Sequence, residues 1–239
     1  MTPTVILSPH PDDAVLSCWH TLTAPGDVTV INLFAGSPTN GTPVAWWDRL
    51  TGATDPIQRM CERLAEDRQA LALAGKAPVN LRFLDDQYRT DAQPIEEIVE
   101  ELRAWLESET AVLAPAGIGA HPDHLLTRSA ALQLHEDGYT VTLYAELPHA
   151  IRRGWPKTTR ESPQGTPPRI DDADWEQALG QIDRARAPTT VHTLSEQQRL
   201  HKIAAVRSYR TQLDALNAMA YRPLDAPDTL RHEITWKLP

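Results

Sequence analysis

The sequence is poor in cysteine, in positive charge and in long apolar runs. Its two cysteines, Cys18 and Cys61, are too few to staple a chain of 239 residues, so we expect buried free thiols rather than a disulfide. A net charge of -9 gives no general attraction to nucleic acid or to an anionic membrane surface. No apolar run reaches transmembrane length, and the start Met-Thr-Pro-Thr lacks the features of a signal peptide. We therefore expect a cytoplasmic protein without nucleic acid or membrane as a partner.

Apolar runs of strand length alternate with amphipathic helical patterns along most of the chain. The runs and their spacing predict strands at 5–7, 28–34, 79–84, 111–114 and 140–144, with helices at 14–22, 60–74, 95–106 and 121–134. Strands separated by helices imply right-handed crossovers and a largely parallel sheet that is covered on both faces. The predicted fold is a three-layer α/β/α sandwich with a mostly parallel, Rossmann-like central sheet.

The remaining segments are a regular tail and two long irregular stretches. We predict a helix at 196–219 and a closing edge strand at 229–238. The irregular stretches, at about 36–56 and 148–188, are long for structureless connections, and the first follows a strand end, where it would shape a binding site. No shift in composition separates two domains, so we expect one domain over residues 1–239.

Two short motifs place imidazole and carboxylate groups just after predicted strands. Ser-Pro-His-Pro-Asp-Asp at 8–13 follows the first strand, and His-Pro-Asp-His at 121–124 follows the fourth across a glycine-rich turn. The carboxyl ends of parallel strands are where ligand sites form in open α/β sheets. Imidazole and carboxylate from two separate loops form the mixed N/O donor set of a transition-metal site.

Each motif also has an alternative interpretation. Asp-Asp and Pro-Asp-His at helix starts act as caps, because carboxylates accept backbone N–H bonds there. The acid pair at 12–13 also suits Mg²⁺ in a phosphoacceptor domain or a phosphatase. That reading requires a phosphorylatable aspartate after the third strand, for which Asp85 or Asp86 would serve, and a strand-borne lysine that does not stand out. It also leaves His121 and His124 without a role.

With these motifs the chain resembles the PIG-L/LmbE-like family of zinc-dependent amidases, which remove N-acetyl groups from amino sugars and related glycosides. The resemblance rests on His-Pro-Asp-Asp at 10–13 and His-Pro-Asp-His at 121–124. Weaker support comes from Arg63-x-x-Glu66, from Phe-Leu-Asp-Asp at 83–86 and from Ser-Tyr-Arg-Thr-Gln at 208–212. It covers most of the chain, although 151–194 has no counterpart.

The resemblance implies a Zn²⁺ site, which would also suit Fe²⁺, with His10, Asp13 and His124 as ligands. Asp12 would be the general base that takes a proton from water, whose pKa a bound cation lowers. His121 would stabilise the oxyanion or protonate the leaving amine. These roles make the chain an N-deacetylase, a hydrolase of linear amide bonds.

Other positions are assigned less directly. Asp123 is expected to orient an imidazole, or only to cap a helix. Ala14 stands where the family usually has glutamate, and no tyrosine precedes the second motif at 118–120. Arg63 and Asp86 would bind sugar hydroxyls, unless Arg63 is a solvated partner of Glu66 or Asp67.

The expected substrate is a soluble small molecule that carries an amino sugar. Trp46 and Trp47 would stack on a sugar face or an aromatic aglycone, or anchor a lid. A mycothiol-type S-conjugate amidase would use the same site, and so is the near alternative. A third interpretation is a catalytically idle relative that only binds sugars. Asp12 argues against it, because a protein that only binds a metal or a sugar has no need of a free carboxylate beside Asp13. The sequence leaves the oligomeric state open, a homo-oligomer included.

Overall fold

The computed structural model describes residues 2–153, 186–187, 189–226 and 228–239. Within these residues a seven-stranded sheet has the order β3-β2-β1-β4-β5-β7-β6. The strands are β1 (Thr4–Ser8), β2 (Val28–Asn32), β3 (Pro78–Asn80), β4 (Ala111–Pro115), β5 (Thr140–Tyr144), β6 (Thr189–Thr193) and β7 (His232–Lys237). β1 to β5 are parallel, whereas β7 runs antiparallel to both β5 and β6.

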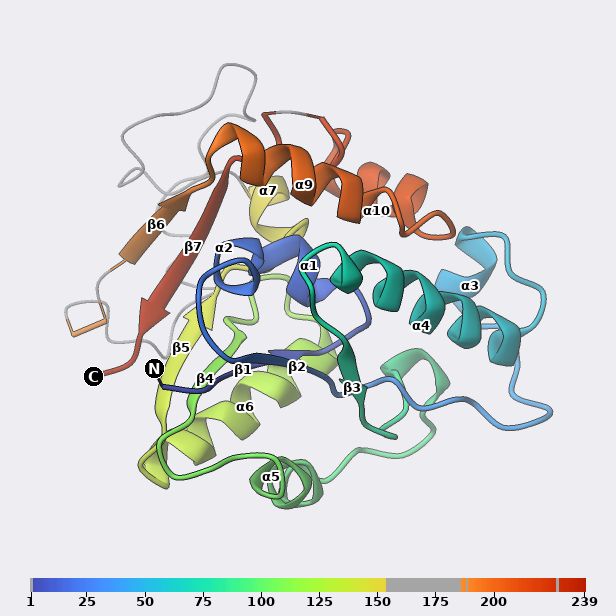
Figure 1. Cartoon of the computed structure of the whole chain (residues 1–239). Helices are drawn as coiled ribbons and strands as arrows, with labels where there is room; N and C mark the ends of the chain where they lie inside the picture. Colours follow the sequence, from blue (N-terminus) through green and yellow to red (C-terminus); the bar gives the residue numbers. More distant parts are fainter. Residues whose placement is uncertain (1, 154–185, 188, 227) are drawn as a thin grey trace.

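Helices cover both faces of this sheet (Figure 1). On one side lie α1 (Asp13–Ser17), α2 (Trp19–Leu22), α4 (Pro56–Ala72), α9 (Glu196–Val206) and α10 (Leu213–Ala220), and on the other lie α5 (Ile95–Arg103) and α6 (Pro122–Glu136). The continuous apolar run Val5, Ile6 and Leu7 in β1 fits this cover, because a strand whose sheet is covered on both faces buries every side chain. All three side chains are buried in the structure. The predicted three-layer α/β/α sandwich with a mostly parallel sheet is confirmed.

The C-terminal strand differs from the prediction. β7 is not an edge strand: it pairs with β5 on one side and with β6 on the other. The edge strand at this end of the sheet is β6, which the sequence analysis does not predict. Most of the predicted loop at 148–188 lies outside the described residues, but its start forms α7 (His149–Arg153).

Several helix boundaries also differ. The helix predicted at 14–22 is divided at Cys18 into α1 and α2, and the one predicted at 196–219 is divided into α9 and α10. α4 begins at Pro56 because the Asp55 side chain caps it by accepting from the N–H groups of Ile57 and Gln58. The irregular stretch at 36–56 contains α3 (Trp46–Leu50). Cys18 is a buried free thiol, but Cys61 is exposed, contrary to expectation.

The position of β1 sets where a ligand site can form. β1 pairs with β2 on one side and with β4 on the other, so the connections leaving it and β4 turn to different faces. Ligand sites of open α/β sheets lie at such a point, outside the carboxyl ends of the strands. None of the helices in the described ranges is long and apolar enough to cross a bilayer.

A buried ion pair joins the C-terminal elements to the helix after β1. Lys202 Nζ of α9 lies 2.5 Å from Glu233 Oε1 of β7, and both side chains are buried. The same carboxylate accepts the backbone N–H groups of Trp19 and His20, each at 2.8 Å. Glu233 therefore satisfies three donors from two helices.

We predict that Lys202→Met destabilises the fold by about 3–5 kcal/mol, because it leaves a buried carboxylate without its cation. The measurement is the free energy of unfolding in urea. Arg103→Met is the matched control, since Arg103 pairs with Asp137 at 2.6 Å on the surface and should contribute no more than about 1 kcal/mol. Equal losses in the two variants would contradict the prediction.

A second buried carboxylate, Asp67 of α4, lies beneath the loops that follow β1 and β2. It accepts from Asn32 Nδ2 at 2.7 Å and from the Tyr209 hydroxyl at 2.8 Å. Burial nonetheless outweighs these bonds and raises the pKa of Asp67 to about 6. The group thus favours the folded state below its unfolded pKa and loses that contribution as pH rises through 6.

We predict that Asp67→Asn becomes more stable relative to the wild type as pH rises from 4 to 7. The relative gain over this range should be about 2 kcal/mol, at about 1.4 kcal/mol for each unit of pKa difference and with the unfolded group already partly ionised at pH 4. Urea unfolding of both proteins across this range measures it. A stability difference that does not change with pH would refute the assignment to Asp67.

Candidate active site

The loop after β1 holds His10, Asp12 and Asp13 in a tight turn. The His10 carbonyl accepts the Ser8 hydroxyl at 2.6 Å and the Asp12 N–H at 2.8 Å. Asp13 Oδ2 accepts the His10 N–H at 2.9 Å, and Asp13 begins α1. Prolines at 9 and 11 fix φ on both sides of His10. The turn thus orients the imidazole and the two carboxylates relative to one another.

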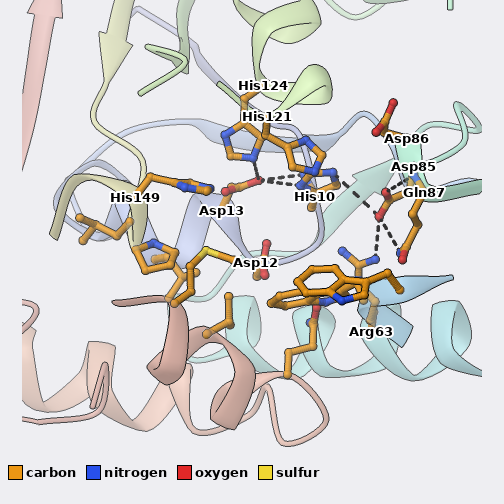
Figure 2. Close-up of a pocket in the computed structure, with 18 residues that line it drawn as sticks. His10, Asp12, Asp13, Arg63, Asp85, Asp86, Gln87, His121, His124 and His149 are labelled. Carbon is orange, nitrogen blue, oxygen red and sulfur yellow. Dashed lines mark hydrogen bonds and ion pairs between the residues drawn. The ribbon is translucent and has the colours of Figure 1, made fainter. Parts of the chain in front are cut away.

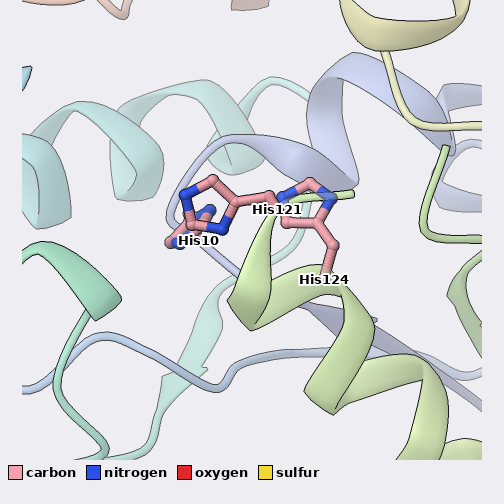
Figure 3. Close-up of side chains that lie close together, drawn as sticks. All are labelled: His10, His121 and His124. Carbon is pink, nitrogen blue, oxygen red and sulfur yellow. The ribbon is translucent and has the colours of Figure 1, made fainter. Parts of the chain in front are cut away.

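The loop after β4 presents a second set of side chains at the start of α6. His121 is the N-cap residue, and its Nδ1 accepts the Asp123 N–H at 3.2 Å. His124 lies one turn into the helix and is buried. The rings of His121 and His124 lie 4.8 and 5.3 Å from the His10 ring, between centroids (Figure 3). Three imidazoles therefore meet where the carboxyl ends of β1 and β4 adjoin.

The Asp13 carboxylate lies between two of these imidazoles (Figure 2). Its Oδ2 is 3.5 Å from His10 Nδ1 and 3.3 Å from His124 Nε2. Zinc–ligand bonds of about 2.0–2.2 Å would place donor atoms of a tetrahedral site about 3.3–3.6 Å apart. Asp13 Oδ2 therefore lies at a ligand-to-ligand distance from each of the two imidazoles. Among the described residues, donor atoms lie within 4.8 Å of one another in two sets, His10 with His121 and His124, and His10 with Asp85 and Asp123; Asp13 belongs to neither set.

The other nitrogen of each imidazole faces a further carboxylate. His10 Nε2 lies 2.9 Å from Asp123 Oδ2, and His124 Nδ1 lies 3.2 Å from Glu146 Oε1. A carboxylate behind a ligating histidine fixes its tautomer and ring orientation. This arrangement directs His10 Nδ1 and His124 Nε2 toward Asp13.

Several carboxylates set the electrostatics of this cluster. Burial opposes ionisation of Asp13 and of Asp85, but neighbouring imidazoles, and Arg63 for Asp85, lower both pKa values, that of Asp85 to about 2. Burial disfavours imidazolium, yet Asp13 and Glu146 raise the pKa of His124 to about 9. For His121, burial and the two adjacent imidazoles lower the pKa to about 4. The lowered pKa of Asp13 and the raised pKa of His124 favour an ionised Asp13 carboxylate beside a positively charged group.

Asp12 differs from Asp13 although it is adjacent in sequence. Its carboxylate makes no hydrogen bond or ion pair to any residue in the described ranges, and it lines the pocket. Burial and the neighbouring Asp13 raise the pKa of Asp12 to about 7. A carboxylate that is free of partners and faces a cavity is available to exchange a proton with a bound molecule.

Arg63 pairs with Asp85 rather than with Asp86, Glu66 or Asp67. Arg63 Nη1 lies 2.8 Å from Asp85 Oδ2, and both side chains are buried, so Arg63 is not a solvated helix residue. Asp86 is more exposed and pairs with Arg89, although it still lines the pocket. Arg89 also reaches Asp123 Oδ1 at 2.6 Å and holds that carboxylate behind His10.

A pocket of about 260 Å³ opens above these groups. Its lining contains, among others, Asp12, Arg63, His121, His124, Trp46 and Trp47. Trp46 is 66% exposed, whereas Trp47 packs against the core, and their rings are 6.0 Å apart. α3 therefore carries both tryptophans at the pocket, next to Asp48, which accepts the Tyr88 hydroxyl at 2.8 Å.

The structure gathers every side chain that the sequence analysis singled out, and adds Glu146 and His149. Glu146 follows β5, so the rule that polar residues just after buried strands form sites would have identified it. His149 had no such signal. Its ring lies edge-on to His124 at 5.5 Å and lines the pocket. Burial and the imidazole of His124 lower the pKa of His149 to about 3.

Histidines and carboxylates thus meet at the switch point of an open α/β sheet, which is where such sheets form their ligand sites. A family model described as PIG-L, GlcNAc-PI de-N-acetylase, matches residues 5–135. The chain belongs to this family.

Comparisons with individual proteins also find deacetylases. 2'-N-acetylparomamine deacetylase of Streptomyces fradiae is 32% identical over 171 residues, which are 63% of this chain and 58% of that protein. The alignment thus spans less than two thirds of that relative. A deacetylase triple mutant of the teicoplanin biosynthetic pathway is 29% identical, with a TM-score of 0.76 over 100% of this chain and 98% of the other. The zinc-inhibited form of teicoplanin deacetylase is 26% identical, with a TM-score of 0.74 and the same coverage.

We predict that Glu146→Ala destabilises the protein more than Glu146→Gln does. Glu146 accepts the N–H groups of Gly117 at 2.6 Å and of Ile118 at 3.2 Å. Alanine leaves both buried donors without an acceptor, at a cost of about 2 kcal/mol or more, whereas glutamine keeps one acceptor oxygen. Urea unfolding measures the difference. Equal stability of the two variants would show that Glu146 does not hold this loop.

Proposed function

We propose that the protein is a metal-dependent amide hydrolase that removes an N-acetyl group from a small molecule containing an amino sugar. The observation that carries the proposal is the Asp13 carboxylate between His10 Nδ1 and His124 Nε2, in the same pocket as the unpartnered Asp12. Membership of a de-N-acetylase family and the deacetylases named above support amide hydrolysis.

The proposed metal ligands are His10, Asp13 and His124, and the ion is Zn²⁺ or Fe²⁺. Asp13 Oδ2 lies 3.5 Å from His10 Nδ1 and 3.3 Å from His124 Nε2, and the carboxylates of Asp123 and Glu146 behind the two imidazoles would orient both rings toward such an ion. When bound, the ion would polarise the amide carbonyl and make water more acidic. The Mg²⁺ phosphoacceptor alternative gives His124 no role, although its Nε2 faces Asp13.

Asp12 is the proposed general base. Its carboxylate removes a proton from the water that attacks the acetamide carbon. His121 lies across the pocket from it, and the Asp123 N–H occupies its Nδ1, so Nε2 is the nitrogen left for the substrate. His121 would stabilise the oxyanion through that nitrogen, or pass the proton that Asp12 took from water on to the amine as the C–N bond breaks. The products are acetate and the free amino sugar.

The sugar would lie beside Arg63 and the aspartates after β3. Asp85 fixes Arg63 through one Nη atom, and Asp86 lies at the same wall. A guanidinium and carboxylates supply the donors and acceptors that neighbouring hydroxyls need. Trp46 and Trp47 would cover a sugar face or an aglycone. A mycothiol-type conjugate would use the same groups, so a substrate panel separates the two.

We predict about one zinc or iron ion per purified chain, and its loss in both Asp13→Ala and His124→Ala. Asp12→Asn should keep the metal but lower kcat for acetate release by about 10²–10⁴-fold, because only the base is removed. The measurements are elemental analysis and acetate release from a panel of N-acetylglucosaminides and mycothiol-type conjugates.

Each part of this experiment has its own contrary result. A chain without a transition metal, or a metal that both ligand variants retain, would refute the proposed ligands and favour the Mg²⁺ alternative. A metal lost as predicted but no acetate release from the panel would leave the metal site supported and the substrate class wrong. Full activity in Asp12→Asn would show that Asp12 is not the base.

A further inference from the structure

His149 fits into a notch that only glycine at position 119 leaves open. A Cβ atom built on Gly119 would lie 2.3 Å from His149 Nδ1 and 2.5 Å from its Cγ. Gly119 has no positive φ, so its backbone conformation does not itself require glycine. The imidazole requires it, because any side chain at 119 would occupy the position of the ring.

The two segments that form this notch are fastened together. Glu146 accepts the N–H groups of Gly117 and Ile118, and the Leu147 N–H donates to the Ser17 hydroxyl at 3.0 Å. These bonds tie the start of α7 to the loop before α6 and to α1. The His149 ring also lies edge-on to His124, with 5.5 Å between the ring centroids. His149 is therefore packed between Gly119 and His124 in the pocket wall.

His149 and the polar wall lie on opposite sides of Asp13. In Figure 2 His149 is on one side of Asp13, and Arg63, Asp85 and Gln87 are on the other. Leu147, Pro148 and His149 line the pocket at the end where His149 lies. The two residues that precede His149, Leu147 and Pro148, are apolar. The proposed function, on which this inference rests, places the sugar at the polar wall and the scissile amide beside Asp12 and Asp13. The acyl group of that amide must then point toward His149.

We propose that His149 determines which acyl group the enzyme removes: its imidazole, seated against Gly119, closes the acyl end of the pocket so that acetyl fits and longer chains do not. The ring acts by its bulk and touches the acyl group directly. Leu147 and Pro148 supply the apolar surface for the methyl group. Gly119 positions the ring, because it is the residue that lets the imidazole reach this place.

The test is a series of glucosamine glycosides acylated with acetyl, propionyl or butyryl, with release of the free amine as the readout. The wild type should prefer acetyl to butyryl in kcat/KM by at least about tenfold, since one added methylene already costs about that much in a closed apolar pocket and butyryl adds two. His149→Ala should bring the two within about threefold, mainly by raising the butyryl value. His149→Phe, of similar bulk and without ring nitrogens, should keep the acetyl preference.

Metal content and the melting temperature are measured on each variant. Gly119→Ala should lower activity on all substrates in the presence of His149, because the added methyl group pushes the ring away from position 119 and into the pocket, and Gly119→Ala/His149→Ala should restore acetyl hydrolysis and show the butyryl hydrolysis of His149→Ala. An acetyl-to-butyryl ratio that is unchanged in a folded, metal-bound His149→Ala enzyme would overturn the inference and leave the proposed function intact. Loss of metal in His149→Ala would overturn it in favour of a role in the metal site. A His149→Phe enzyme that accepts butyryl would refute the role of bulk, and a wild type inactive on the whole series would refute the proposed function itself.

Discussion

The parallel pairing of β1 with β4 is the constraint on which the rest of the site depends. Thr4 to Ile6 lie in register with Ala111 to Leu113, so the two strands end next to each other although more than a hundred residues separate their motifs. The loops that follow them leave toward different faces of the sheet, and the space between them receives the side chains of both. Asp13 from one loop and His124 from the other therefore approach within 3.3 Å.

From that meeting point, carboxylates and imidazoles alternate across the site: Asp123, His10, Asp13, His124 and Glu146. Burying one of these groups alone would be unfavourable, since an unpaired ion in a low dielectric loses its hydration. In alternation each ring lies between two carboxylates, and each outer carboxylate is tied in turn to backbone N–H groups of the surrounding loops. When both imidazoles are neutral, the three carboxylates outnumber Arg89, the cation that pairs with Asp123, and leave negative charge that a bound cation would neutralise.

Much of this arrangement could be predicted from sequence, because it rests on local patterns. Apolar runs followed by His, Asp and Pro identified both loops, and a family resemblance assigned roles to them. Glu146 obeys the same rule after β5 but stands alone, without a motif to single it out. The division between α9 and α10 depends on contacts across the molecule: Glu66 accepts from the backbone and the side chain of Thr211, and Tyr209 reaches Asp67. Helical periodicity contains no information about such distant partners.

The residues that line the pocket come from two parts of the chain, one for its floor and one for part of its wall. The floor, with His10, Asp12, Asp13, Arg63, His121 and His124, lies inside the segment that the family model matches, residues 5–135. The wall formed by Leu147, Pro148, His149, Gln212, Leu216 and Met219 lies beyond it, on α7, α10 and the segments before them. Groups that act on the amide must keep fixed distances from one another, whereas groups that face the rest of the substrate need only match its shape. If the proposed reaction is correct, the segment after residue 135 can change its shape to suit the substrate while the groups within 5–135 keep their positions.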